Sequence, residues 1–218
     1  MKKTVLKIIY DFICMPLRLV LLPDNICERL GLTSLRQERV FNVLPHVRGR
    51  LIDIGCGDNT LVNIYSNGLG VDNRDLGKGA IIIKDVANLP FEDHTFDTVT
   101  FVASLNHIVS RKEALSEARR LLKPEGRLII TMIGPVIGEI AHLLWWYSED
   151  KHRGGMKNGE VGGMTTKEIL RLCLEAGFQL KEHQRIVYKM NNIYIFELKN
   201  AKETTESTEK NYNLKRSL

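Results

Sequence analysis

A carboxylate and two glycines follow one another at a spacing that could bind a small ligand. Leu51–Ile54 is short and mostly apolar, which suits a buried parallel strand, and Gly55 and Gly57 allow a tight turn close to a ligand. Asp53 stands two residues before the turn, where a carboxylate suits a ligand amino group and repels a pyrophosphate. Thr60 replaces the third glycine of the dinucleotide fingerprint, which argues against a nicotinamide oxidoreductase. The alternative role for Asp53 is to cap the turn without a ligand.

Two more acids follow the next apolar segments. Asp72 ends Gly68–Asp72 and could accept hydrogen bonds from both hydroxyls of a ribose. Asp85 follows the β-branched run Ala80–Lys84 and could accept from an adenine amino group while the backbone of Val86 meets the ring. Each acid alone could be an ordinary loop residue. Three acids at three expected strand ends favour a shared ligand site.

The elements that must position these acids alternate between strands and helices, which predicts a doubly wound α/β fold. Further expected strands are Phe96–Val102 and Arg127–Met132, and a final antiparallel pair is expected at Phe178–Val187 and Asn192–Leu198. Expected helices are Thr60–Tyr65, Arg111–Leu122 with Lys123–Gly126 as its stop signal, and a helix from Thr165, capped with Glu168, to Ala176.

Several motifs recur in an order and spacing that resemble a known family. They are Asp53-x-Gly55-x-Gly57, Asp72, Asp85-x-x-x-Leu89-Pro90-Phe91, Phe96-Asp97-x-Val99 and Leu121-Leu122-Lys123-Pro124-x-Gly126-x-Leu128. As a set they resemble the class I S-adenosylmethionine-dependent methyltransferases, in particular the small-molecule group with quinone- and sterol-methylating enzymes. The resemblance covers about residues 48–132. It implies a Rossmann-like, mostly parallel seven-stranded sheet with an antiparallel last strand, and S-adenosylmethionine as cofactor.

The resemblance also implies roles for individual residues. Asp53 and the glycine turn would surround the methionine part, Asp72 would bind the ribose, and Asp85 would frame the adenine. The expected cofactor-binding residues are Asp53, Gly55, Cys56, Gly57, Asp72, Asn73, Asp85, Val86 and Ala103. One departure is Asn59, where the family often has glycine, but asparagine tolerates a left-handed conformation better than most residues.

The residues after Phe96–Val102 would face the reacting methyl group. His107 is the candidate general base, because the unperturbed pKa of histidine, about 6.5, suits proton transfer at neutral pH. The alternative is that His107 packs against or caps the following helix. The Asn/Asp-Pro-Pro-aromatic motif of relatives that methylate nucleic acid amino groups is absent here, which disfavours a nucleic acid substrate.

Ile133–Met164 is too long for a simple connection and is the candidate for substrate choice. An aromatic-rich helical pattern over Gly138–Tyr147 is followed by a glycine-rich stretch, which suits a lid. The expected substrate residues are Asn106, His142, Trp146 and Tyr147. The alternative is that the two tryptophans lie in the core and the glycines form a surface loop.

Composition limits the remaining possibilities. The chain has 218 residues, 44% hydrophobic and 26% charged, as in a globular protein. The net charge of +5 lies entirely in residues 1–50, with nine basic and four acidic side chains, so the main body offers no nucleic acid face. Four cysteines without metal-ligand or C-x-x-C spacing predict neither zinc nor a redox dithiol, and favour the cytoplasm. We expect a helical segment at 1–47, the methyltransferase domain at 48–200 and a disordered tail at 201–218.

Met1–Pro23 is amphipathic, with a kink expected at Pro16. Lys7, Asp11 and Arg18 interrupt the apolar run and no cleavage site follows, so it is not interpreted as a signal peptide. Two interpretations stay open: a helix packed on the domain or on a second subunit with its charged edge in water, or a helix lying on the inner face of the membrane. Asp24–Val43 is expected to be one further helix with Arg36–Arg39 exposed. The oligomeric state is open.

The sequence therefore predicts a methyltransferase that acts on a small molecule, and the acceptor becomes a lipid-linked one if the N-terminal helix lies on a membrane. The alternative is a non-catalytic subunit that binds S-adenosylmethionine.

Overall fold

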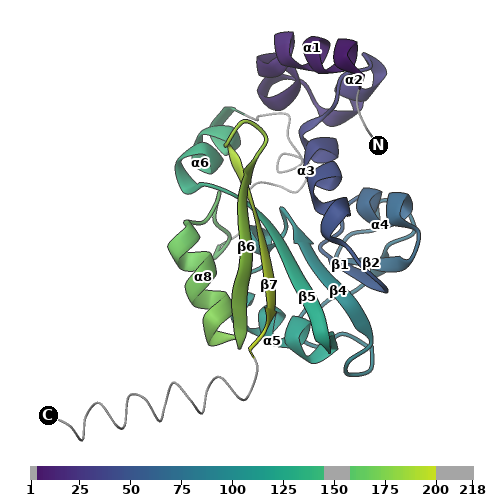
Figure 1. The fold of residues 1–218 in the computed structure, drawn as a ribbon, viewed down its shortest axis with the longest axis vertical. Coiled ribbons are helices and arrows are strands. Elements are labelled where there is room, and N and C mark those ends of the chain that lie inside the picture. Colours follow the sequence, from purple (N-terminus) through teal and green to yellow (C-terminus); the bar gives the residue numbers. More distant parts are fainter. Residues whose placement is uncertain (1–3, 145–157, 200–218) are drawn as a thin grey trace, which may run out of the picture.

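A seven-stranded sheet lies at the centre of the fold. The computed structural model describes residues 4–144 and 158–199, and the strands in this part follow the order β3-β2-β1-β4-β5-β7-β6 (Figure 1). In chain order they are β1 Leu51–Ile54, β2 Gly68–Asp72, β3 Ile81–Ile82, β4 Phe96–Val102, β5 Leu122–Ile133, β6 Phe178–Ile186 and β7 Asn191–Leu198. Strands β1 to β5 pair in parallel, and β7 runs antiparallel to β5 and β6. The predicted fold class is confirmed.

Helices cover both faces of the sheet, because alternate residues of a strand point to opposite faces. Ile52 packs in one core cluster with Leu115 of α5 and Ile169 of α8, whereas Leu51 packs in a second cluster with Leu61 of α4. The helices are α1 Val5–Ile13, α2 Asp24–Arg29, α3 Leu35–Val43, α4 Thr60–Tyr65, α5 Arg111–Leu121, α6 Pro135–Leu144 and α8 Thr166–Glu175, with short helical turns at Leu17–Leu21, Leu44–His46 and Leu105–His107. The predicted capping box of Thr165 and Glu168 at the start of α8 is confirmed.

The prediction of one helix over Asp24–Val43 was wrong. The chain forms α2 and α3, separated by a turn at Gly31, whose φ of +67° lies in the left-handed region. Ser34 then starts α3 with a capping box, since its hydroxyl accepts from the Gln37 N–H and the Gln37 side chain accepts from the Ser34 N–H. The spacing Ser34-x-x-Gln37 is the signal that could have located this second start.

Three other boundaries differ from the prediction. Lys123–Gly126 is not a loop after the helix, because β5 begins at Leu122 directly after α5 and its pairing with β4 is irregular between Phe96 and Thr98. The third strand consists of Ile81–Ile82 alone, and α6 begins at Pro135 rather than Gly138. The predicted tail and the central part of the predicted lid lie outside the described residues.

The N-terminal segment turns its charged side toward the protein, so the expectation of a packed helix with its charged edge in water was wrong. Asp11 is 1% exposed and accepts from the Thr33 N–H at 2.9 Å and the Thr33 hydroxyl at 2.6 Å. Arg18 is equally buried, pairs with Glu38 at 2.9 Å and donates to the Tyr188 hydroxyl at 3.2 Å. These contacts join α1 and the turn after it to α3 and to the β6–β7 connection.

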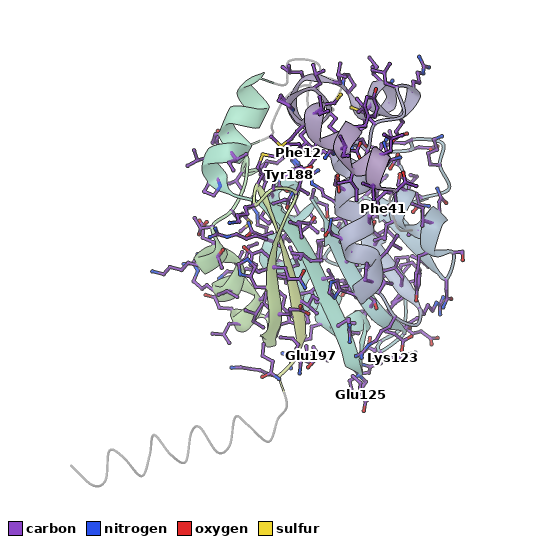
Figure 2. All side chains as sticks on the ribbon, turned by 45° about the horizontal axis from the view of Figure 1, so that its top comes forward. Phe12, Phe41, Lys123, Glu125, Tyr188 and Glu197 are labelled. Carbon is purple, nitrogen blue, oxygen red and sulfur yellow. The ribbon has the colours of Figure 1, made fainter. Side chains whose placement is uncertain are left out.

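Figure 2 shows the same junction from another side, with Phe12 and Tyr188 close together and Lys123, Glu125 and Glu197 at the opposite end of the molecule. The ring centroids of Phe12 and Tyr188 are 6.2 Å apart. Among the residues described, none of the helices has the length and apolar character needed to span a bilayer.

Candidate functional site

The glycine turn lies after β1, where the strand order reverses between β2 and β4. The N–H of Gly55 donates to the carbonyl of Val71 at 2.8 Å, which ties the turn to β2. Gly55 and Gly57 have φ values of +72° and +55°, which glycine adopts without strain. A Cβ at Gly55 would lie 2.5 Å from the Cβ of Ser104, whereas a Cβ at Gly57 would meet nothing within 4 Å. Asn59 has the left-handed conformation that its position requires, with a φ of 61°.

Asp53 is a buried carboxylate at the end of β1. It is 2% exposed, and the Thr100 hydroxyl of β4 donates to it at 2.6 Å. The pKa of Asp53 is raised to about 7, chiefly by burial and in addition by the nearby carboxylates of Asp72 and Asp58, while the Thr100 hydrogen bond opposes the rise. A cation placed beside this carboxylate would lower its pKa and stabilise its charged form.

Asp72 ends β2, and Asp85 follows three residues after β3, at the same edge of the sheet. One oxygen of Asp72 accepts from the Gly57 N–H at 2.9 Å and the other from the Arg74 N–H at 3.0 Å. Asp85 is exposed and accepts from the Ala87 N–H at 2.9 Å. Each carboxylate oxygen keeps a second lone pair that can accept from a ligand hydroxyl or amino group.

A cavity of about 720 Å³ opens at this edge and brings the predicted residues together. Its lining includes all nine predicted cofactor residues, Asp53, Gly55, Cys56, Gly57, Asp72, Asn73, Asp85, Val86 and Ala103, and also Asn106 and His107. Of the other predicted substrate residues, His142 lies in α6. Its side chain, together with Trp146 and Tyr147, lies outside the described part of the chain.

His107 lies in a short hydrogen-bonded chain beside the cavity. The Asn106 amide nitrogen lies 3.0 Å from His107 Nε2, and because an amide nitrogen only donates, Nε2 accepts and Nδ1 carries the proton. Nδ1 then donates to Glu160 Oε2 at 3.3 Å, and the same Asn106 nitrogen donates to the Val161 carbonyl at 3.2 Å. The Glu160 side chain is 3% exposed.

Glu160 was missed by the sequence analysis. It lies 53 residues beyond His107, so only the fold joins the two side chains. The sequence did contain a signal, because Glu160 is the one carboxylate in the glycine-rich stretch 154–163.

The N-terminal segment forms one side of the cavity, which the sequence analysis also missed. Arg36 had been expected to be exposed, but its side chain is only 24% exposed, and it pairs with Asp58 of the glycine turn at 2.6 Å and with Glu28 of α2 at 3.0 Å. Apolar residues from the segment line the cavity as well: Leu19, Leu22, Pro23, Leu35 and Val40. The helical segment and the sheet therefore share one binding space.

Comparison with known sequences points to methyltransferases. Residues 52–130 match the model of a family described as a methyltransferase domain. The chain is 28% identical over 145 residues to a demethylmenaquinone methyltransferase of Thermotoga maritima, covering 60% of this chain and 63% of that protein. It is 33% identical over 96 residues to a ubiquinone/menaquinone biosynthesis C-methyltransferase of Bordetella avium, covering 42% and 38%. The matches span less than two thirds of either relative.

Solved structures share the fold at low sequence identity. A methyltransferase of Thermotoga maritima described as a possible histamine N-methyltransferase superposes with a TM-score of 0.59 at 19% identity, covering 75% of this chain and 89% of that one. The [4+2]-cyclase SpnF superposes with a TM-score of 0.56 at 14% identity, covering 75% and 82%. The fold by itself thus admits more than one chemistry.

The matched domain begins within β1 and ends within β5, so it contains the glycine turn and all three acids of the cavity. Residues 52–130 of this chain are therefore a methyltransferase domain of the class I S-adenosylmethionine-dependent type.

Proposed function

We propose that this methyltransferase acts on a small amphiphilic molecule, with a quinone or another lipid-linked compound as the leading class and nucleic acid excluded. The observation that carries the proposal is the two-sided cavity. Carboxylates and the glycine turn line one side, and the N-terminal segment lines the other with five apolar residues beside polar ones such as Arg36 and Arg39. An acceptor with a reactive polar group and an apolar tail suits such a space.

The acidic side of the cavity is assigned to the donor. When bound, S-adenosylmethionine supplies a methyl group on a sulfonium leaving group, and the molecule also carries an ammonium group. We assign Asp53 to the ammonium, Asp72 to the ribose hydroxyls, and Asp85 with Val86 to the adenine. The buried Asp53 carboxylate and the open space beside Gly57 support this fit.

The Asp72→Ala substitution should weaken binding of both S-adenosylmethionine and S-adenosylhomocysteine by about 10- to 100-fold, because hydrogen bonds to a charged acceptor are lost. Calorimetric titration measures this effect, with NADH as a ligand that should not bind. Asp75→Ala is the matched control, since Asp75 is an exposed acid of the same loop and accepts only from the Gly77 N–H among the hydrogen bonds found. Equal affinities for both variants would contradict the assignment of Asp72.

Two observations support an amphiphilic acceptor: the apolar residues that line the cavity, and the names of two relatives. Ile133 and Ile137, near the start of α6, line the cavity together with Leu22 and Val40 of the N-terminal segment. Two relatives are named for menaquinone or ubiquinone biosynthesis, and these acceptors combine a ring with an apolar tail. Both observations favour an amphiphile over a fully polar metabolite.

His107 is proposed as the general base for an acceptor that loses a proton. Glu160 holds the proton on Nδ1, so Nε2 is the ring nitrogen that can take up a proton. Asn106 now donates to Nε2 and would release it by keeping only its bond to the Val161 carbonyl. Glu160 then stabilises the imidazolium that forms, in the manner of a carboxylate that orients a catalytic histidine.

The His107→Gln substitution should lower kcat by about 100-fold and leave the affinity for S-adenosylmethionine unchanged, because a general base contributes at least this factor. Glu160→Gln should lower kcat less than His107→Gln does, and it should shift the ascending limb of the pH–rate profile. Steady-state kinetics across pH measures both effects. An unchanged kcat in His107→Gln would show that His107 packs beside the site and that the acceptor needs no base.

The proposed acceptor class is tested by transfer of a radiolabelled methyl group. The panel holds a demethylated quinone with a short isoprenoid tail, the same ring without the tail, a water-soluble amine and tRNA. We expect label in the quinones, with a lower KM for the tailed compound. Label in the amine or the tRNA in preference to the quinones would overturn the proposal.

A further inference from the structure

Helix α1 exposes an apolar stripe along its whole length. Leu6 is 78% exposed and Ile13 71%, and Val5, Ile8, Ile9 and Phe12 are each half exposed or more. Their spacing of one, three, four and seven residues places them on one side of a helix. We call these six residues the docking face. A face of this size and composition is unusual on the surface of a protein that stays in water.

Buried polar contacts hold the docking face outward. Asp11 lies on the opposite side of α1 and is bound by both the N–H and the hydroxyl of Thr33. Arg18, just after the helix, donates to the carbonyl of Asp11 at 2.6 Å and to that of Thr33 at 2.8 Å. Turning the apolar stripe inward would break these bonds and leave charged groups unpaired, which is costly.

The charges around the docking face are predominantly positive. Each of the four acids of residues 1–50 forms an ion pair within the segment, in the pairs Asp11–Lys7, Asp24–Arg36, Glu28–Arg36 and Glu38–Arg18. Arg29 is exposed at the end of α2, and the sequence carries Lys2 and Lys3 directly before α1. The segment thus combines an exposed apolar stripe with a net positive charge.

We propose that the docking face binds the surface of a membrane that contains anionic lipid. The apolar side chains enter the boundary between headgroups and acyl chains, and the positive charges meet the lipid phosphates. A second copy of the chain is the less favoured occupant. A two-fold interface places the same patch on both sides, so the positive charges would repel each other.

The cavity lies next to the membrane-docking segment, which would help a lipid acceptor to enter the cavity. Leu22 and Pro23, which follow the helical turn Leu17–Leu21, line the cavity, so the segment that meets the membrane also borders the acceptor space. An amphiphilic acceptor could pass from the lipid to the cavity without crossing bulk water. This consequence rests on the proposed acceptor class, whereas the docking itself does not.

The test is co-sedimentation of the full chain with vesicles of phosphatidylcholine, with and without phosphatidylglycerol. We expect binding to the mixed vesicles and weaker binding to the neutral ones. The double variant Leu6→Gln/Ile13→Gln should lose vesicle affinity by about tenfold or more, because two apolar side chains no longer enter the lipid. The matched control Leu174→Gln/Leu180→Gln changes two exposed leucines of α8 and β6 and should bind as the unchanged protein does.

Two further measurements separate the outcomes. Calorimetric titration with S-adenosylmethionine should give the same affinity for both double variants, which shows that they are folded and separates docking from the donor site. Equal vesicle binding by both double variants would overturn the proposal. Sedimentation velocity tests whether a second copy of the chain covers the docking face instead. The docking face would be assigned to a second copy if the unchanged protein were a dimer that does not bind vesicles and Leu6→Gln/Ile13→Gln were a monomer.

Discussion

Asp53→Asn should weaken S-adenosylmethionine binding by on the order of 1000-fold at about pH 8 and should also raise the thermal stability of the unliganded protein. The two effects have one cause. Asp53 is buried, and among the residues that the structure describes no cation pairs with it, so its charge costs folding free energy until a ligand ammonium arrives. Asparagine keeps the shape and still accepts from the Thr100 hydroxyl, but it carries no charge.

The pH dependence of both effects follows from the raised pKa of Asp53, about 7 in the unliganded protein. The unfolded carboxyl titrates near its ordinary value of 3.8, so the folded protein holds a proton that the unfolded chain has lost between these values. The stability contributed by the protonated group is fully present below 3.8 and is lost as the pH rises through about 7. The stability advantage of Asp53→Asn should therefore be largest above pH 7 and shrink as the pH falls.

Ligand affinity should show the opposite dependence. Below about pH 7 the unchanged protein must release a proton from Asp53 before it can pair with the ammonium, so affinity should fall up to about tenfold per pH unit. Titration calorimetry in buffers of different ionisation enthalpy measures the released proton. Asp75→Asn, which changes an exposed acid, is the control and should show neither effect. An affinity independent of pH between 5.5 and 7.5, roughly, would contradict the role given to Asp53.

Arg18→Met should lower the free energy of unfolding by about 3–5 kcal/mol, the usual effect of removing one partner of a buried ion pair. The guanidinium pairs with Glu38, donates to the carbonyls of Asp11 and Thr33 and lies 5.7 Å from the ring centroid of Tyr188. Methionine keeps much of the volume but leaves these acceptors unsatisfied. Urea denaturation measures the change.

The same substitution should loosen the N-terminal helices before the sheet unfolds, because Arg18 joins them to α3 and the β6–β7 connection. Trypsin should then cleave within residues 7–29 faster than in the unchanged protein. Arg171→Met, on the exposed side of α8, is the control and should leave stability within about 0.5 kcal/mol. If Arg18→Met were no less stable than this control, the buried network would not hold the segment in place.

The sequence predicted that the residues proposed for the donor site lie together, because they follow from strand ends. Asp53, Asp72 and Asp85 lie at or shortly after the ends of three parallel strands, and these strands end at one edge, so their order along the chain implies nearness in space. The partners of His107 and Asp58 could not be predicted in this way. Glu160 and Arg36 reach them from other parts of the chain, and no periodicity encodes such a contact.

The sequence by itself determined the fold class, the glycine turn and the amphipathic character of α1, because these depend on local conformation and on the period of apolar residues. Only the tertiary structure decided which side of α1 faces outward. An apolar stripe is ordinarily buried, and the exception here depends on the buried Asp11 and Arg18 finding partners in Thr33, Glu38 and Tyr188. A hydrophobic period shows that a helix has two sides, whereas the partners available in the folded chain decide which side is buried.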